Sequence, residues 1–166
     1  MRKVGRHIAM VLALVAGSAM LNHENSAYAR GPYSSTAQVM RAAERGDVNA
    51  QAHLGWMYSV GVGVPQNYVL AAKWYLCAAE RGHGAAQFAL GLLYNKGQGV
   101  QHDLVLAYMW LNLSAAQARG ENRDFRVRIR DAIASKMTIA EIAVAQQIAL
   151  DQAAVRGRRS SLRISP

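Results

Sequence analysis

The sequence predicts an all-α protein, a right-handed α-α superhelix (solenoid) built from short helical hairpins. The main observation is an internal repeat: when the 166-residue chain is shifted by 36 residues, 18 of the 38 positions from Ala42 to Ala79 are identical. Chance would give about three, and a period of this length is typical of solenoids. Apolar residues within the repeat also recur at helical spacing. The composition is 52% hydrophobic but only 7% aromatic, which favours close-packed helices over a β-sandwich.

Residues 1–29 have the pattern of a secretory signal peptide. A basic start precedes an uncharged, largely apolar run from Ile8 to Leu21, and Ala27-Tyr28-Ala29 matches a cleavage site. The 14 residues of that run would extend about 21 Å as a helix, less than the hydrocarbon core of about 30 Å. A cleaved signal is therefore favoured over an uncleaved anchor. We expect an exported chain, periplasmic or secreted, that begins near Arg30 and has no membrane span.

Charge and cysteine content exclude several classes of protein. The chain has 19 Lys and Arg against 10 Asp and Glu, a net charge of +9, and removal of the signal leaves about +7. An exported protein rarely meets nucleic acid, so we interpret this charge as general surface electrostatics or as attraction to anionic envelope components. Cys77 is the single cysteine, which excludes an intramolecular disulfide and a cysteine-rich zinc site.

The repeat divides the chain after the signal into an orphan helix at 36–46, one repeat at 47–82 and a second at 83–120. The orphan helix ends in the same Ala-Ala-Glu-Arg-Gly sequence that closes the first repeat. Each repeat is predicted to contain a helix, a glycine-containing loop, a second helix and a turn. A single hairpin of this kind cannot bury its own apolar face, so neighbouring hairpins must stack.

Local signals mark the ends of these helices. Gly61 and Gly97 follow the first helix of each repeat, where glycine accepts the left-handed conformation of a helix end, so a positive φ is expected at both. Asn67 and Asp103 stand where the second helices begin and are expected to be their N-caps.

Two further helices over 121–155 are predicted to cap the solenoid. Residues 122–137 combine an alternating segment with a longer helical pattern, and the longer pattern favours a helix. Thr138 and Glu141 form a capping box at the start of the next helix. That helix is predicted to carry one apolar face, made by Ile139, Ile142, Ala143, Leu150 and Ala153. The basic segment 156–166 is predicted to be a flexible tail.

The residues shared by the two repeats resemble the Sel-one-like repeat (SLR), a relative of the tetratricopeptide repeat (TPR), of the proteobacterial exported type. The pattern combines Leu-Gly-x-x-Tyr, Gly-x-Gly-Val and Ala-x-x-Trp. The matching structural positions are Leu54, Gly55, Tyr58, Gly61, Gly63, Trp74, Leu90, Gly91, Tyr94, Gly97, Gly99 and Trp110. The resemblance implies a TPR-like solenoid whose first helices line the inner surface. It also implies a role as an adaptor, assembly or signalling-regulator protein with a protein or peptide partner.

Positions that vary between the repeats suggest a partner-binding groove on the first helices. Trp56 is replaced by Leu92, and both lie off the faces that carry the shared residues. Packing between repeats is an equally good explanation for Trp56. Trp74 and Trp110 occupy the same repeat position, so both are predicted to be core residues. The candidate groove residues are Gln51, Trp56, Ser59, Gln87, Leu92 and Asn95.

A basic stripe offers a second candidate surface. Arg123, Arg126 and Arg130 lie at i, i+3 and i+7 of the predicted helix. A solvated helix face is the simpler interpretation. The alternative is a docking stripe for an acidic partner or for anionic envelope glycan or peptidoglycan.

The sequence contains no motif for catalysis, for a cofactor or for a metal. His53, His83 and His102 are spread over different elements, with no metal-binding spacing. The Gly-x-Gly pairs lack the third glycine of a dinucleotide site, and no nucleophile motif occurs. The sequence therefore predicts a non-enzymatic protein-interaction module of the bacterial cell envelope. Binding of envelope glycan or peptidoglycan is the alternative, and the oligomeric state is left open.

Overall fold

The computed structural model describes residue 33 and residues 35–161, with side chains as far as residue 158. This part of the chain holds seven helices and no strand, which confirms the all-α prediction. They are α2 (Thr36–Glu44), α3 (Val48–Val60), α4 (Tyr68–Glu80), α5 (Gly84–Lys96), α6 (Leu104–Gln117), α7 (Gly120–Ala134) and α8 (Ile139–Ser161). All seven belong to one compact unit that begins at Thr36. The predicted signal peptide at 1–29 lies outside the described residues.

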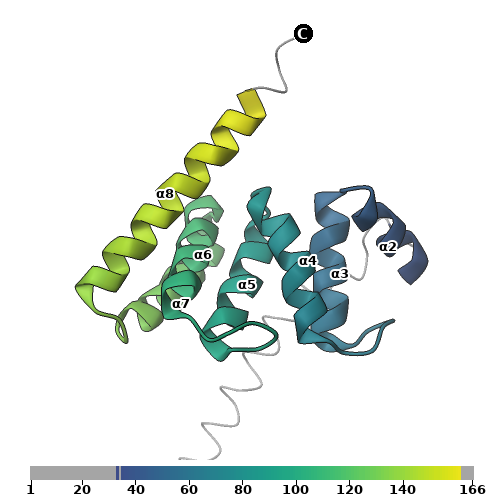
Figure 1. The fold of residues 1–166 in the computed structure, drawn as a ribbon, viewed down its shortest axis with the longest axis horizontal. Helices are drawn as coiled ribbons and strands as arrows, with labels where there is room; N and C mark the ends of the chain where they lie inside the picture. The colour runs from purple at the N-terminus through teal and green to yellow at the C-terminus, as the bar shows by residue number, and fades with distance from the viewer. Residues whose placement is uncertain (1–32, 34, 162–166) are drawn as a thin grey trace, which may run out of the picture. The chain divides into compact units, whose positions relative to one another are not determined.

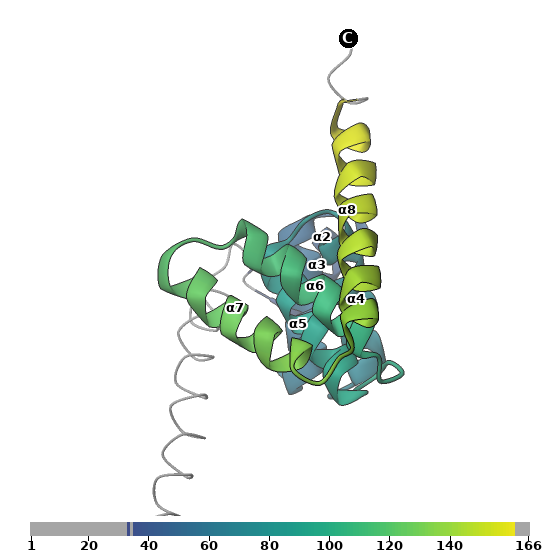
Figure 2. The ribbon, with the colours of Figure 1, turned by 90° about the vertical axis from the view of Figure 1, so that its left-hand side faces the viewer.

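The helices stack in chain order along one direction (Figure 1). From α2 to α6, each helix packs against the next, and α3 also contacts α5. Helix α6 is then covered by two helices, since both α7 and α8 pack against it. Figure 2 shows these last two helices diverging from their connection near Met137.

The expected helix ends are confirmed. Gly61 and Gly97 follow α3 and α5 with φ angles of 80° and 64°, in the left-handed region that glycine enters at little cost. The Asn67 side chain accepts a hydrogen bond from the Leu70 amide at 3.0 Å. Asp103 accepts the equivalent bond at the start of α6, at 2.9 Å. Each repeat thus forms its hairpin from signals within about 20 residues.

The repeated Leu-Gly pair lets the two helices of a hairpin approach closely. A Cβ at Gly55 would lie 2.7 Å from the ring of Tyr75, and a Cβ at Gly91 would lie 2.8 Å from Leu111 Cγ. Such distances are well inside van der Waals contact. The preceding Leu54 is almost fully buried. The pair therefore combines a core side chain with a position where only glycine fits.

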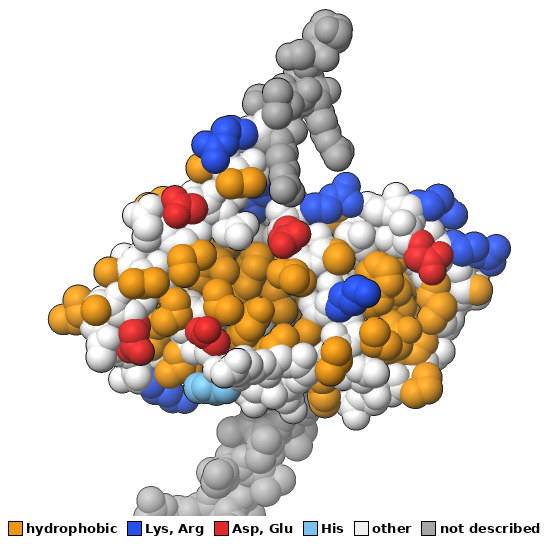
Figure 3. Space-filling view, in the orientation of Figure 1, with side chains coloured by type: hydrophobic (Ala, Val, Ile, Leu, Met, Phe, Trp, Pro, Cys, Tyr) orange, Lys and Arg blue, Asp and Glu red, His pale blue; other side chains and the backbone are white. Residues whose placement is uncertain are grey.

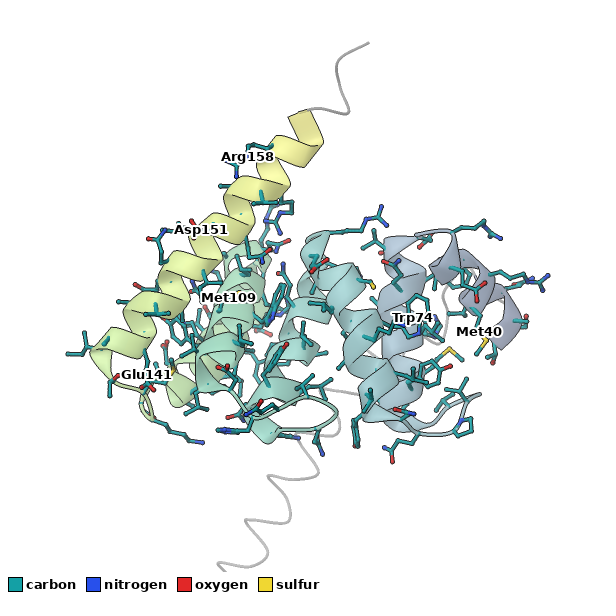
Figure 4. All side chains as sticks on the ribbon, viewed as in Figure 1. Met40, Trp74, Met109, Glu141, Asp151 and Arg158 are labelled. Carbon is teal, nitrogen blue, oxygen red and sulfur yellow. The ribbon has the colours of Figure 1, made fainter. Side chains whose placement is uncertain are left out.

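The prediction that both repeat tryptophans are core residues was wrong for one of them. Trp110 is 4% exposed, whereas Trp74 is only partly buried and lies among the side chains of α3 and α4 (Figure 4). The difference follows from their neighbours. Helix α6 is packed by α5, α7 and α8, while α4 is packed by α3 and α5.

Helix α7 confirms the helix that was predicted for residues 122–137 from their longer apolar pattern, against the strand that the alternating stretch alone would suggest. Ile133 is its one fully buried residue. Ile129 and Met137 pack partly against the core.

Helix α8 begins at the predicted capping box. Glu141 accepts a hydrogen bond from the Thr138 amide at 2.8 Å, and Thr138 Oγ1 accepts one from the Glu141 amide at 3.2 Å. The buried face of α8 differs from the predicted one. Ala145 and Ala149 face the core with partly buried Ile142, whereas Ile139 is 88% and Leu150 is 65% exposed, and Ala143 is exposed too. Small alanine side chains let α8 lie close to α6.

The end of α8 also differs from the sequence prediction, which began a flexible tail at residue 156. The helix continues to Ser161. The side chain of Arg156 lies against Gly82, at the end of α4. The last turns of α8 thus lie beside the end of an earlier repeat.

Candidate functional site

Two residues of the predicted groove, Gln51 and Gln87, are structural. Both are buried, with exposed fractions of 8% and 0%. Gln51 Nε2 donates to the Ala43 carbonyl at 3.2 Å, and Gln87 Nε2 donates to the Ala79 carbonyl at 3.1 Å. The last carbonyls of a helix have no partner within it. The repeated glutamine therefore ties each repeat to the preceding helix and lines no open surface, which corrects the groove prediction.

Trp56 and Leu92 occupy equivalent positions on α3 and α5, and both are half-buried and pack against the core. The ring of Trp56 lies 5.6 Å from the ring of His53, tilted by 45°. Val60 continues the same side of α3 one turn further and is 45% exposed. On α5, exposed Lys96 occupies the position equivalent to Val60.

Because α3 and α5 are in contact and carry these residues at equivalent positions, we treat the two rows as one candidate surface. We name it the first-helix surface, made by His53, Trp56, Val60, Leu92 and Lys96. Its side chains are the aromatic pair His53 and Trp56, the aliphatic groups of Val60 and Leu92, and the cation of Lys96.

The remaining groove candidates lie beside the first-helix surface. Ser59 Oγ donates to the Trp56 carbonyl at 2.8 Å and lies 3.4 Å from the hydroxyl of Tyr75. This directs Ser59 toward α4. Asn95 takes the equivalent position on α5 and is half-buried. Ser59 is therefore not on the open side of α3.

The basic stripe is divided between internal and external roles. Arg126 Nη1 donates to Ser114 Oγ at 2.9 Å, and its guanidinium lies 5.6 Å from the centre of the Phe88 ring. Arg130 donates to Asn112 Oδ1 at 3.1 Å and pairs with Asp131 at 2.7 Å. These two arginines hold α7 against α5 and α6. The prediction of a three-residue docking stripe is corrected accordingly.

Arg123 is the exposed member of the stripe. It lines an open cavity of about 700 Å³ at the turn between α6 and α7, together with Gln117 and Arg119. This surface is short, because Arg126 one turn later is directed inward.

The surroundings of His53 and Tyr94 shift the pKa values of both side chains. Burial lowers the pKa of His53. Burial and then the charge of Asp103 raise the pKa of Tyr94.

Among the described residues, no three His, Cys, Asp or Glu side chains are grouped to hold a metal. Within the same residues, no helix is both long and apolar enough to cross a membrane.

Three members of the first-helix surface were missed from the sequence. From the sequence, His53 was weighed only as a metal ligand, and Val60 and Lys96 were not singled out. The spacing contained the signal, because residues 53, 56 and 60 lie at i, i+3 and i+7 of one helix. Their counterparts 36 residues later mark the same side of α5.

The repeated hairpins, tied end to end by buried glutamines, define the class of this protein: an all-α solenoid of the TPR-like kind. A model of the Sel1 repeat family matches residues 48–83 and 84–118. The chain belongs to the Sel1 repeat family, which confirms the resemblance to SLR proteins. Proteins of this family generally mediate protein–protein interaction and are non-catalytic scaffolds.

The solved structures similar to this chain include two proteins with SLR or Sel1 repeats. One is a protective antigen present in uropathogenic Escherichia coli strains, displaying an SLR fold, with 28% identity and a TM-score of 0.65 over 77% of this chain. This chain spans only 28% of that antigen's length. The other is a Sel1 repeat protein from Oxalobacter formigenes, 42% identical with a TM-score of 0.50, covering 54% of this chain and 68% of that one. No curated protein matches the chain.

Proposed function

We propose that this chain is a non-enzymatic protein-interaction module of the bacterial cell envelope, with an adaptor, assembly or signalling-regulator role. The observation that carries the proposal is the first-helix surface. Trp56 and Leu92 take equivalent places on two adjacent helices, with open positions beside them. Tryptophan in a partly covered site is typical of residues that dominate binding energy at protein interfaces.

One face of the molecule also carries exposed apolar side chains (Figure 3). Figure 3 shows apolar side chains gathered over α5, α6 and α8 and again over α3 and α4. Apolar areas bounded by charged groups are characteristic of surfaces that bind proteins.

Glycan binding through the basic stripe receives less support. That alternative needs several outward-facing cations, and Arg126 and Arg130 bond within the protein. Arg123 and Arg119 alone face solvent at this turn. Such a small cluster of surface charges contributes little once salt screens it.

The test is capture of envelope proteins by the mature chain, with Trp56→Ala as the variant and Arg123→Ala as the matched control. We expect Trp56→Ala to weaken capture of the main partner by about 2 kcal/mol and to leave the helical circular dichroism intact. Arg123→Ala should retain capture at physiological salt. Equal capture by wild type and Trp56→Ala, with loss in Arg123→Ala and steep salt dependence, would instead support the glycan-type surface.

The envelope location rests on the predicted signal at 1–29 and has its own test. Sequencing the amino terminus of the protein purified from its host should give a chain that starts at or near Arg30. A cytoplasmic product that keeps Met1 would exclude the envelope location.

A further inference from the structure

The two repeats begin their first helices with different capping groups. Asp47 Oδ1 accepts a hydrogen bond from the Ala50 amide at 2.8 Å. In the second repeat, His83 Nδ1 accepts the equivalent bond from the Ala86 amide at 3.2 Å. An imidazole nitrogen accepts only when it carries no proton, so this cap requires neutral histidine. A carboxylate cap has no such requirement above about pH 5.

The cap at His83 adjoins the contacts that hold α7. Ser114 Oγ of α6 donates to the Gly84 carbonyl, the residue after His83, at 2.7 Å. The same hydroxyl accepts from Arg126 of α7 at 2.9 Å. Beside this bridge, the rings of Phe88 and Phe125 lie 5.8 Å apart. A short chain of contacts therefore links the first turn of α5 to α7.

The charges around His83 are mostly positive. Arg126 comes from α7, and Arg156 of α8 lies against Gly82, the residue before His83. Helix α6 contributes only the neutral Ser114 and Gln117 here, and α4 ends with exposed Glu80 and Arg81. The amino-terminal end of α5 adds a further partial positive charge. Burial and then the Arg126 charge lower the pKa of His83, while a hydrogen bond with its own backbone raises it.

We propose that His83 is an acid-sensitive latch, and that its protonation releases α7 from α5 and α6. Protonation removes the acceptor of the α5 cap and places a second cation beside Arg126. The docked arrangement then loses the cap and gains charge repulsion. The released arrangement returns His83 to solvent, where the imidazolium is hydrated. Release uncovers Phe88, which is 8% exposed in the docked protein.

The direction of the pH effect follows from proton linkage. The docked state holds the His83 pKa below the ordinary value of 6.5, so the released state binds the proton more tightly. Docking is therefore at full strength above about pH 6.5 and weakens as the pH falls below it. Linkage to a single proton increases the opening equilibrium constant of α7 by up to about tenfold per pH unit.

The test is hydrogen–deuterium exchange of the mature chain between about pH 7.5 and about pH 5, corrected for intrinsic exchange rates. Peptides from α7 should lose protection on acidification, while peptides from α3 keep theirs. His83→Asn should abolish this pH dependence, because asparagine caps without titrating, as Asn67 does at α4. His53→Asn is the matched control: that histidine also has a lowered pKa but lies on α3, so its variant should retain the response.

Three results would overturn the latch. One is unchanged α7 protection across the range, and another is persistence of the pH dependence in His83→Asn. The third is simultaneous loss of protection in α3 and α7, which would indicate global unfolding. If His83→Asn shows altered helix content at neutral pH, His83→Asp supplies the same test with the cap of the first repeat.

Discussion

Helices α4 and α6 hold the same place in the two repeats, yet their surfaces differ. On α4, Val69 is 64% exposed and Leu76 is also exposed. Their counterparts on α6, Val105 and Asn112, are partly buried. The four consecutive residues from Tyr108 to Leu111 are all buried, with Met109 among them (Figure 4).

The difference arises outside the repeat. Helices α7 and α8 both pack on α6, and in the described part of the chain no equivalent pair packs on α4. The repeat sequence therefore specifies the hairpin, and the neighbours of each hairpin decide which of its side chains are buried. Matched substitutions at equivalent positions of the two repeats distinguish the contribution of the repeat sequence from the contribution of the neighbouring helices.

The largest contrast is expected at the repeat tryptophans. Trp110→Ala should lower the free energy of unfolding by about 3 to 5 kcal/mol, because it leaves a cavity in a closed core. Trp74→Ala should cost less than about 2 kcal/mol, because part of that ring is already in water. Urea denaturation followed by circular dichroism measures both values. Equal costs would show that the neighbours of α6 do not determine this burial.

A smaller difference in the free energy of unfolding is expected between alanine substitutions of the glycines in the two loops. Gly99 has a φ of 71°, and a Cβ there would collide with the backbone carbonyl of Tyr68. At Gly63, with a φ of 70°, a Cβ would meet the side chains of Thr36 and Met57 instead.

Side chains can move where backbone cannot, so Gly99→Ala should cost about 2 to 4 kcal/mol and Gly63→Ala about 1 to 2. Thermal denaturation of the two variants provides the comparison. A Gly63→Ala cost as large as that of Gly99→Ala would contradict this account.

The next smaller difference in the free energy of unfolding is expected between substitutions of the two buried glutamines. Gln87 Oε1 accepts from Gln117 at 2.6 Å in addition to the bond that Gln87 donates. Gln51 Oε1 is buried with no hydrogen-bond partner among the described residues. Gln87→Leu should therefore cost about 2 kcal/mol and Gln51→Leu about 1, because the second change also removes an unpaired buried oxygen. Urea midpoints at constant m-value would reveal the order, and the reverse order would refute it.

The smallest effects are expected at the N-caps of the second helices, and they should be equal. Asn67→Ala and Asp103→Ala each remove one side-chain bond to the first turn. Each should cost roughly 0.5 to 1 kcal/mol. Thermal unfolding midpoints of the two variants should fall together. A clear inequality would mean that even the hairpin signals depend on their neighbours.

These comparisons also explain which features the sequence could predict. The helix ends at Gly61 and Gly97 and the cap at Asn67 depend on the conformations of one residue and its near neighbours. Such preferences act within one or two turns, so the sequence pattern is sufficient.

The candidate site needed information from distant parts of the chain. Two shared glutamines could equally bind a partner or hold a helix end, and the sequence does not show that carbonyls from another helix lie beside them. Arg126 has the spacing of a surface stripe, but Ser114 and Phe88 draw it inward. On α8, apolar residues occur on several sides, so periodicity alone selected Ile139 and Leu150 over the alanines that pack on α6.

The buried glutamines also bear on how this solenoid unfolds. Each one belongs to one repeat and bonds to the last turn of the helix before it. If one repeat opened alone, the glutamine bond to its neighbour would be lost, and the carbonyl would keep only the turn bond from the Gly46 or Gly82 amide. In a nearest-neighbour description of repeat proteins, this penalty strengthens the coupling between adjacent units. The segment from α2 to α6 should therefore melt as a single cooperative unit, although each of its hairpins is specified locally.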